Sequence, residues 1–257
     1  MLHIVREEIR LSVELATPLI RDPDLSAAQR CPSQPQSCNW DVVVHFRCGD
    51  IRRSAHGAYG FLSFKYYTHV FQQLLHLHRP RVLILTNGHR HLRRGRKLLG
   101  SAQTRSHISS PCVHLKDSST VVSDCSVLVR ALGDHLLQKL KVSSVQIREE
   151  GSIDADFGLM LVGARHFVAS ISTFSMLAGL LRTRGVAIVP RWPALYHQLG
   201  TADLQRRVDA FESASPVGNR STKIIWAPTK AHGRDMVVSS VDACKTNISD
   251  LLARLQP

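Results

Sequence analysis

The chain has 257 residues, of which 44% are hydrophobic and 21% are charged, and this balance excludes a disordered or fibrous protein. A chain of this length can bury a sizeable core and fits one principal domain with extensions. The 33 Lys and Arg residues outnumber the 20 Asp and Glu residues, so the net charge is +13. Such a charge favours anionic partners, for example phosphates, nucleic acid or a membrane surface.

The N-terminal region predicts a lead-in to the main domain. Residues 3–20 set apolar side chains among charges in a roughly helical rhythm, which predicts a helix. Residues 22–39 are rich in proline and polar residues and predict a linker, which Cys31 and Cys38 could close. We expect no transmembrane segment in this chain, because no apolar stretch reaches the roughly 20 residues that span a bilayer. Acidic residues near the N-terminus argue against a signal peptide there.

From residue 42 onward, apolar runs alternate with helical patterns. Val42–Val44 and Arg81–Thr86 lack polar alternation, which is typical of strands covered on both faces of a parallel sheet. Further strands are predicted over 142–148, 167–170 and 186–189, with an edge strand at 224–226. Helices are predicted over 63–78, 91–99, 124–141, 154–163, 173–182 and 248–255. This order predicts an α/β fold: a Rossmann-like open parallel sheet with helices on both faces.

Cysteines and glycosylation patterns add two weaker signals. The six cysteines show neither a C-x-x-C spacing nor a histidine at metal-ligand spacing, so a structural zinc site is not expected, whereas disulfides stay open. Asn219-Arg-Ser221 and Asn247-Ile-Ser249 both match the N-x-S/T acceptor pattern. That pattern matters if the chain enters the secretory pathway.

The first candidate site, His45 to Asp50 (HFRCGD), directly follows the first predicted strand. Ligands of doubly wound sheets bind beyond the carboxyl ends of strands, where this segment would lie. Arg47 can make a bidentate contact to a diphosphate, His45 can hydrogen-bond a base or ribose, and Gly49 permits a tight turn. Asp50 can orient Arg47 or act as a base toward an acceptor hydroxyl. Alternatively, Asp50 and Arg47 form a turn-stabilising ion pair, and His45 is a buried, satisfied histidine.

The second candidate site, Ser170 to Ser175 (SISTFS), lies where a predicted strand gives way to a predicted helix. Free N–H groups and the macrodipole at a helix N-terminus hold anions. The segment therefore predicts a diphosphate cradle formed by Ser172, Thr173, Phe174 and Ser175. Phe174 can also pack against a base or sugar. The alternative is an ordinary Ser/Thr helix cap.

A third element, Asp154 to Phe157 (DADF), opens the helix predicted over 154–163. It brings a carboxylate, Asp156, near the same edge of the sheet. That carboxylate can pair with the N–H groups of guanine or with ribose hydroxyls. A role as an N-terminal helix cap is about equally well supported.

Together and in this order, the three elements resemble the donor-binding half of fucosyltransferases, most closely the α1,2-fucosyltransferase family with its H-V-R-R-G-D signature. The family's later motif is an Asp-Phe-x-Leu-Leu helix, a strand and a Gly/Ser-Thr-Phe-Gly/Ser helix start. It is similar to Asp156–Met160 (DFGLM) followed by Ser172–Ser175 (STFS). Thr86-Asn87-Gly88 is similar to the family's Ser-Asn-Gly. The resemblance covers about residues 42 to 190.

The resemblance implies a GT-B fold, of which this chain would be one half, and a GDP-fucose donor. It implies transfer to a hydroxyl of a glycan or glycoprotein acceptor, with inversion and without a required metal or cofactor. Arg47 would contact the GDP phosphates, His45 and Asp156 would lie at the nucleoside, and Thr173 and Phe174 would line the diphosphate and base. A Golgi location, with an anchor upstream in a full-length form, would follow.

The resulting domain organisation has a lead-in and linker over 1–40, a GDP-sugar-binding domain over 41–200 and an extension packed on it over 201–257. Two departures from the family stand out. Cys48 occupies the place of the second arginine, so one positive charge near the phosphates is missing. Only 44 residues precede His45, whereas the relatives carry a longer region that helps to form the acceptor side.

These departures motivate a rival interpretation, a glycosyltransferase-like domain that binds a nucleotide or glycan without turnover. A second rival is a Rossmann-like protein that binds RNA or another polyanion through the basic cluster 89–97 (HRHLRRGRK). That cluster lacks interleaved aromatic residues and overlaps a predicted helix start, so a solvated basic face is the preferred interpretation. Nucleic acid is therefore not an expected partner.

Overall fold

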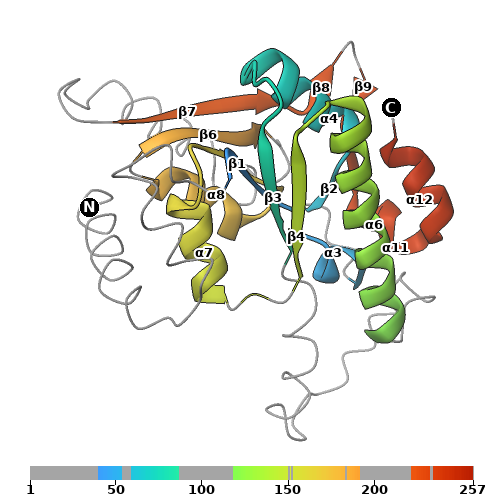
Figure 1. Ribbon diagram of the computed structural model, residues 1–257. Helices are drawn as coiled ribbons and strands as arrows, with labels where there is room; N and C mark the ends of the chain where they lie inside the picture. Colours follow the sequence, from blue (N-terminus) through green and yellow to red (C-terminus); the bar gives the residue numbers. More distant parts are fainter. Residues whose placement is uncertain are drawn as a thin grey trace, which may run out of the picture.

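The computed structural model describes residues 40–53, 59–86, 118–149, 151, 153–182, 184–191, 221–231 and 234–256. Within them, six strands form one sheet in the order β4-β3-β1-β5-β6-β7, and every neighbouring pair runs parallel (Figure 1). The strands are β1 (Val42–His45), β3 (Arg81–Leu85), β4 (Ser144–Arg148), β5 (His166–Val168), β6 (Arg184–Arg191) and β7 (Ser221–Pro228). The predicted open parallel sheet is confirmed.

The order of the strands reverses once along the chain. From β1 the chain adds β3 and then β4 on one side, and it then returns to add β5, β6 and β7 on the other side. Counted along the chain, this is the 3-2-1-4-5-6 order of the doubly wound Rossmann fold. The reversal lies between β1 and β5. In sheets of this kind, the crevice that binds ligands is expected at the carboxyl ends of the two strands that flank such a reversal.

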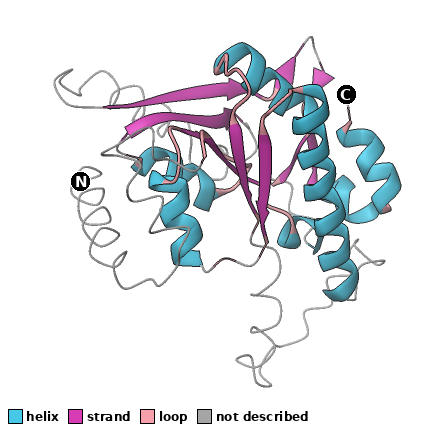
Figure 2. Ribbon diagram, in the orientation of Figure 1, coloured by secondary structure: helices cyan, strands magenta, loops and turns pink. Residues whose placement is uncertain are grey.

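Helices surround the sheet (Figure 2). They are α3 (Gly49–Arg53), α4 (Phe64–His69), α6 (Ser118–Lys139), α7 (Ile153–Val162), α8 (Thr173–Leu181), α11 (Ser240–Lys245) and α12 (Ile248–Leu255). A Cβ on Gly133 of α6 would contact Ile147, whereas a Cβ on Gly179 of α8 would contact Phe167. Ile147 aligns across the sheet with Val168, the neighbour of Phe167. Because neighbouring strand residues point to opposite faces, α6 and α8 cover opposite faces.

The central strands β1 and β3 are buried on both faces because they consist almost entirely of apolar residues. Val42, Val43 and Val44 are fully buried, as are the residues of β3 after Arg81. On one face α7 packs against α8, and on the other α4 and α12 pack against α6. The site at the end of β1 therefore rests on a continuous core.

Most of the predicted elements are present, with shifted ends. The helix predicted over 63–78 is α4, extended by a π-helical turn over Val70–Leu74. It ends before His76, whose φ of 48° cannot continue a right-handed helix. The helix predicted to begin at Asp124 begins earlier, at Ser118. The predicted edge strand is the centre of the longer strand β7.

Several short elements were not predicted from the sequence. They are α3, α11, β2 (Gly60–Leu62) with its antiparallel partner β10 (Val237–Ser239), and β8 (Lys230–Ala231) with its antiparallel partner β9 (Arg234–Asp235). The predictions for residues 3–20, 22–39 and 91–99, for closure by Cys31 and Cys38, for Asn87-Gly88, for Asn219 and for the cluster 89–97 lie outside the described residues. Among the described helices, none combines the length and the apolar character needed to cross a bilayer.

Candidate functional site

The two motifs meet where the strand order reverses. His45 is the last residue of β1, and Ser170 follows β5 by two residues. The His45 Nδ1 and Ser170 Oγ atoms are hydrogen-bonded at 2.8 Å, although the residues are 125 positions apart in the chain. His45 is 1% exposed, so it is buried, as the structural alternative predicts, and Ser170 is the hydrogen-bond partner of its Nδ1. Its partner, however, belongs to the other candidate motif.

Serine hydroxyls shape the start of α8. Ser172 is the N-cap residue, and its Oγ accepts a hydrogen bond from the Ser175 N–H at 3.4 Å. The Oγ of Ser175 accepts in turn from the Ser170 N–H at 2.8 Å. Both side chains are buried. The predicted cap is confirmed, and these two hydroxyls hold the turn in place.

Thr173 and Phe174 are the more open residues of this turn. Thr173 is exposed and Phe174 is half-buried. The Phe174 ring lies edge-on to the His45 ring at 6.1 Å and packs against the Phe157 ring of α7 at 5.1 Å, centroid to centroid. Aromatic pairs at these distances attract each other. The ring of Phe174 is thus held between two elements while part of its surface stays open.

Asp156 is buried in the first turns of α7, where its exposed fraction is 1%. Its Oδ1 accepts a hydrogen bond from Nε of Arg148, the last residue of β4, at 3.0 Å. A Cβ on Gly151 would lie only 1.9 Å from the same oxygen, so the backbone there fits closely around the carboxylate. A buried carboxylate needs such a partner. The pair fixes Arg148 at the carboxyl edge of the sheet. In the sequence, the only indication of this position is that Arg148 ends the strand predicted over 142–148.

Arg47 follows β1 and lies across an aromatic ring. Its guanidinium carbon is 4.1 Å from the centroid of Tyr59, a cation–π contact. Arg47 is half-buried, and so is Tyr59. Gly49 and Asp50 lie in α3. Sequence reasoning missed Tyr59, because a lone tyrosine before a three-residue strand carries no recognisable pattern.

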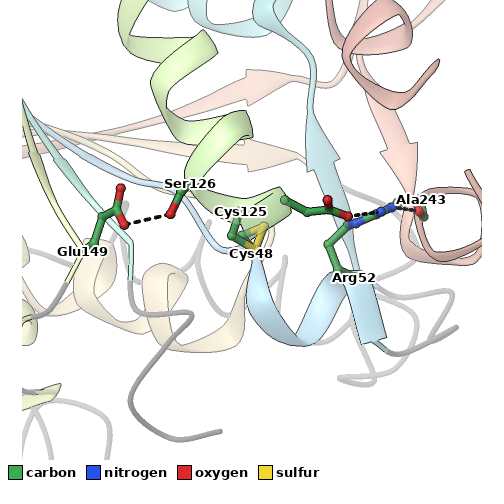
Figure 3. Close-up of a disulfide and its surroundings, with 7 residues drawn as sticks. Cys48, Arg52, Cys125, Ser126, Glu149 and Ala243 are labelled. Atoms are coloured by element: carbon green, nitrogen blue, oxygen red, sulfur yellow. Dashed lines mark hydrogen bonds and ion pairs between the residues drawn. A yellow bond between two sulfur atoms is a disulfide. The ribbon is translucent and has the colours of Figure 1, made fainter. Parts of the chain in front are cut away.

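Three consecutive residues of α6 anchor the segments around this edge of the sheet (Figure 3). Cys125 forms a disulfide with Cys48, whose sequence separation is 77. Asp124 forms a buried ion pair with Arg52 of α3. Ser126 donates a hydrogen bond to Glu149, the residue after β4, at 2.9 Å. We call Asp124, Cys125 and Ser126 the α6 anchor.

The disulfide changes the interpretation of position 48. The resemblance presents Cys48 as the loss of a phosphate-binding arginine. In the structure Cys48 is 1% exposed and bonded to Cys125, which is fully buried. Position 48 therefore fastens the segment after β1 to α6. The absence of a metal-ligand spacing among the cysteines left disulfides possible, but it does not identify which cysteines pair.

Arg52, the partner of Asp124, also binds residues near the C-terminus. Its guanidinium donates to the carbonyl oxygens of Ala243 and, at 3.0 Å, of Thr246. At 1% exposed it is among the most deeply buried charged residues that the structure describes. In the described part of the chain, no three His, Cys, Asp or Glu side chains gather as metal ligands would.

Comparison with models of known protein families finds none that matches this chain, and comparison with curated proteins finds no match. The resemblance to fucosyltransferases thus depends on the motifs themselves.

Proposed function

We propose that the crevice between the carboxyl ends of β1 and β5 binds the diphosphate of a nucleotide sugar, and that the chain is a glycosyltransferase using GDP-fucose. The observation that carries this proposal is the hydrogen bond between His45 and Ser170, at the strand-order reversal. It joins the two motifs that a fucosyltransferase donor site would require at the place where this fold binds nucleotides. The chain would then be the donor half of a GT-B enzyme.

Burial suggests how the work is divided among the residues. Arg47, Thr173 and Phe174 keep accessible surface, so they are the proposed contacts to the donor. The N–H groups at the start of α8 and the Arg47 guanidinium would neutralise the leaving diphosphate, a task that needs no metal. In the proposed reaction, the glycosyl bond to the diphosphate would break while an acceptor hydroxyl attacks the sugar carbon from the opposite side. Asp50 is the proposed base for that hydroxyl's proton.

The buried residues would act by positioning. His45 and Ser170 align the end of β1 with the start of α8, and Ser172 and Ser175 set the helix turn. Asp156 would act at the nucleoside side of the site, where it holds Arg148. Preorganised donors of this kind stabilise charge without rearranging during the reaction.

The disulfide supports a place in the secretory pathway, because disulfides form and persist in oxidising compartments. A Golgi enzyme acting on a glycan or glycoprotein acceptor fits that environment. The disulfide also weakens the argument for a domain that binds a nucleotide or glycan without turnover. That argument relied on Cys48 as a lost arginine, whereas Cys48 has a structural role.

Calorimetry with GDP tests the proposal. The wild type should bind GDP, and Arg47→Ala should weaken binding about tenfold or more, because a hydrogen bond to a charged group contributes about 1.5–3 kcal/mol. Arg254→Ala is the matched control, since it removes the same charge from the exposed last turn of α12. No GDP binding by the wild type, or equal GDP affinity of the wild type and Arg47→Ala, would contradict the proposed nucleotide-sugar site.

A transfer assay with GDP-fucose and a panel of β-galactoside acceptors then separates turnover from binding alone. Transfer that is lost in Arg47→Ala supports an enzyme. GDP binding without transfer to any acceptor would favour the nucleotide-binding interpretation instead.

A further inference from the structure

A second functional feature lies at the beginning of α12, away from the crevice. The tripeptide Asn247-Ile-Ser249 matches the N-x-S/T acceptor pattern for N-linked glycosylation. Asn247 and Ser249 are both exposed in the folded protein. An attached oligosaccharide is bulky and must project into solvent, so exposure of both residues is the first requirement.

The local geometry leaves the fold intact when the amide nitrogen is modified. Asn247 is the N-cap of α12, and its Oδ1 accepts a hydrogen bond from the Asp250 N–H at 2.9 Å. Its Nδ2 donates to the Asp250 carboxylate at 2.7 Å. A glycan bonded to Nδ2 replaces one of two hydrogens there and does not change Oδ1. The capping bond, which is the one that stabilises the helix, therefore survives modification.

The redox chemistry of the chain agrees with the compartment in which such glycans are added. Cys48 and Cys125 form a buried disulfide. Cys244, three residues before Asn247, is disulfide-bonded as well. Disulfides of this kind are rare in reducing compartments. The acceptor tripeptide thus belongs to a protein in which the three described cysteines are oxidised.

The tripeptide is also held at a defined place. Arg52 binds the carbonyl oxygens of Ala243 and Thr246, which fixes the residue before Asn247 to α3. The helix α12 packs on α6, on the face of the sheet opposite α7 and α8 (Figure 1). A glycan at this position would lie outside the crevice of His45 and Ser170.

From these observations we infer that Asn247 is an acceptor for an N-linked oligosaccharide. The donor class is an oligosaccharide carried on a lipid diphosphate. The bond between the sugar anomeric carbon and the diphosphate oxygen breaks, and a bond from that carbon to Asn247 Nδ2 forms. The nitrogen loses one proton, and the lipid diphosphate departs with the bonding electrons. The product has a neutral amide linkage.

The test is expression of the whole chain behind a cleavable secretion signal in animal cells, followed by peptide mapping of the purified protein. Digestion with an N-glycosidase in heavy-oxygen water converts a glycosylated Asn247 to labelled Asp. Label at position 247 is expected in the wild type. Unlabelled, unmodified Asn247 in secreted, disulfide-bonded wild type would overturn the inference.

A matched pair of variants isolates the acceptor pattern from the helix cap. Ser249→Thr keeps the pattern and should keep the glycan, whereas Ser249→Ala keeps Asn247 as the cap but should lose the glycan completely. Asn247→Asp retains a capping carboxylate and removes the acceptor nitrogen, so it serves if Ser249→Ala folds poorly. Modification that persists in Ser249→Ala would contradict the inference.

GDP binding provides a readout that is independent of this site. Because α12 packs on α6 over one face of the sheet, whereas the crevice lies at the carboxyl edge, Ser249→Ala should bind GDP as the wild type does. Failure of glycosylation leaves the GDP result unchanged, and failure of GDP binding leaves the mass of the Asn247 peptide unchanged. The two proposals can therefore fail separately.

Discussion

The two sides of the carboxyl edge of the sheet are held together by different chemistry. On the side of α6, a disulfide and a buried ion pair fasten the segment after β1. On the side of α8, hydrogen bonds between serine hydroxyls, backbone and His45 form the turn. The first set is strong and inaccessible, whereas the second leaves Thr173 and Phe174 open. We therefore expect changes near α6 to affect folding and changes near α8 to affect binding.

The largest effect is expected at Arg52. Replacing it by Met leaves the buried Asp124 carboxylate unpaired, and breaking a buried pair from one side costs about 3–5 kcal/mol. Urea unfolding of Arg52→Met should show this loss. Asp124→Asn in the same background should recover part of it, because the uncompensated charge disappears. A loss below about 1 kcal/mol would show that the pair does not fasten α3.

The disulfide comes next. Replacing both Cys48 and Cys125 by Ser should lower the free energy of unfolding by about 2–5 kcal/mol. The same variant should bind GDP more weakly, because Arg47 is the neighbour of Cys48. Unfolding and calorimetry on one preparation measure both effects. Lower stability with unchanged GDP affinity would separate the α6 anchor from the proposed site.

The comparison also shows what a sequence can and cannot predict. The strands predicted over Val42–Val44 and Arg81–Thr86 are confirmed as β1 and β3 within one residue, because short β-branched and aliphatic runs without polar alternation are typical of the interior of a parallel sheet. The cap at Ser172 was predicted because its hydrogen bond is local. Both signals lie within a few residues of the element that they define.

Long-range pairings were not predictable in this way. Cys48 and Cys125 are 77 positions apart, and their spacing identifies no partner. In the sequence, Arg52 is followed by another arginine, a pattern typical of an exposed segment. In the structure it is buried, and its partners there are Asp124 and the carbonyl groups of Ala243 and Thr246. The reversal of strand order depends likewise on crossovers that the sequence pattern does not encode.

A smaller effect, on stability as well as on binding, is expected on the α8 side. Ser170→Ala removes the hydroxyl bonded to His45 and should cost about 1–3 kcal/mol of stability, because a buried ring nitrogen loses its partner. It should also weaken GDP binding about tenfold under the proposed function. Thr68→Ala is the matched control: it breaks a 2.9 Å hydroxyl–histidine bond to His135 on the opposite face. If both variants bind GDP like the wild type, the crevice does not need the His45 bond.

The smallest effect concerns the opposite edge of the sheet. Burial, with a further contribution from Arg165 and Arg182, lowers the pKa of His166 from 6.5 to about 4 although Asp41 opposes the shift. Between pH 6.5 and about 4, His166 is protonated in the unfolded chain but not in the folded chain. The free energy of unfolding therefore falls as the pH drops through this range, and His166 does not affect it above pH 6.5. As the pH falls from 6.5 to about 4, the free energy of unfolding of His166→Gln should decrease by about 1 kcal/mol less than that of the wild type. Parallel pH profiles of unfolding for the two proteins would contradict this.

The crystal structure of the chain with bound GDP tests the central claim most directly. The account predicts the diphosphate at the start of α8, beside Thr173 and within reach of Arg47, with the His45–Ser170 hydrogen bond preserved beneath it. GDP bound elsewhere on the molecule, or in the crevice without a contact to Arg47 or to the start of α8, would contradict it.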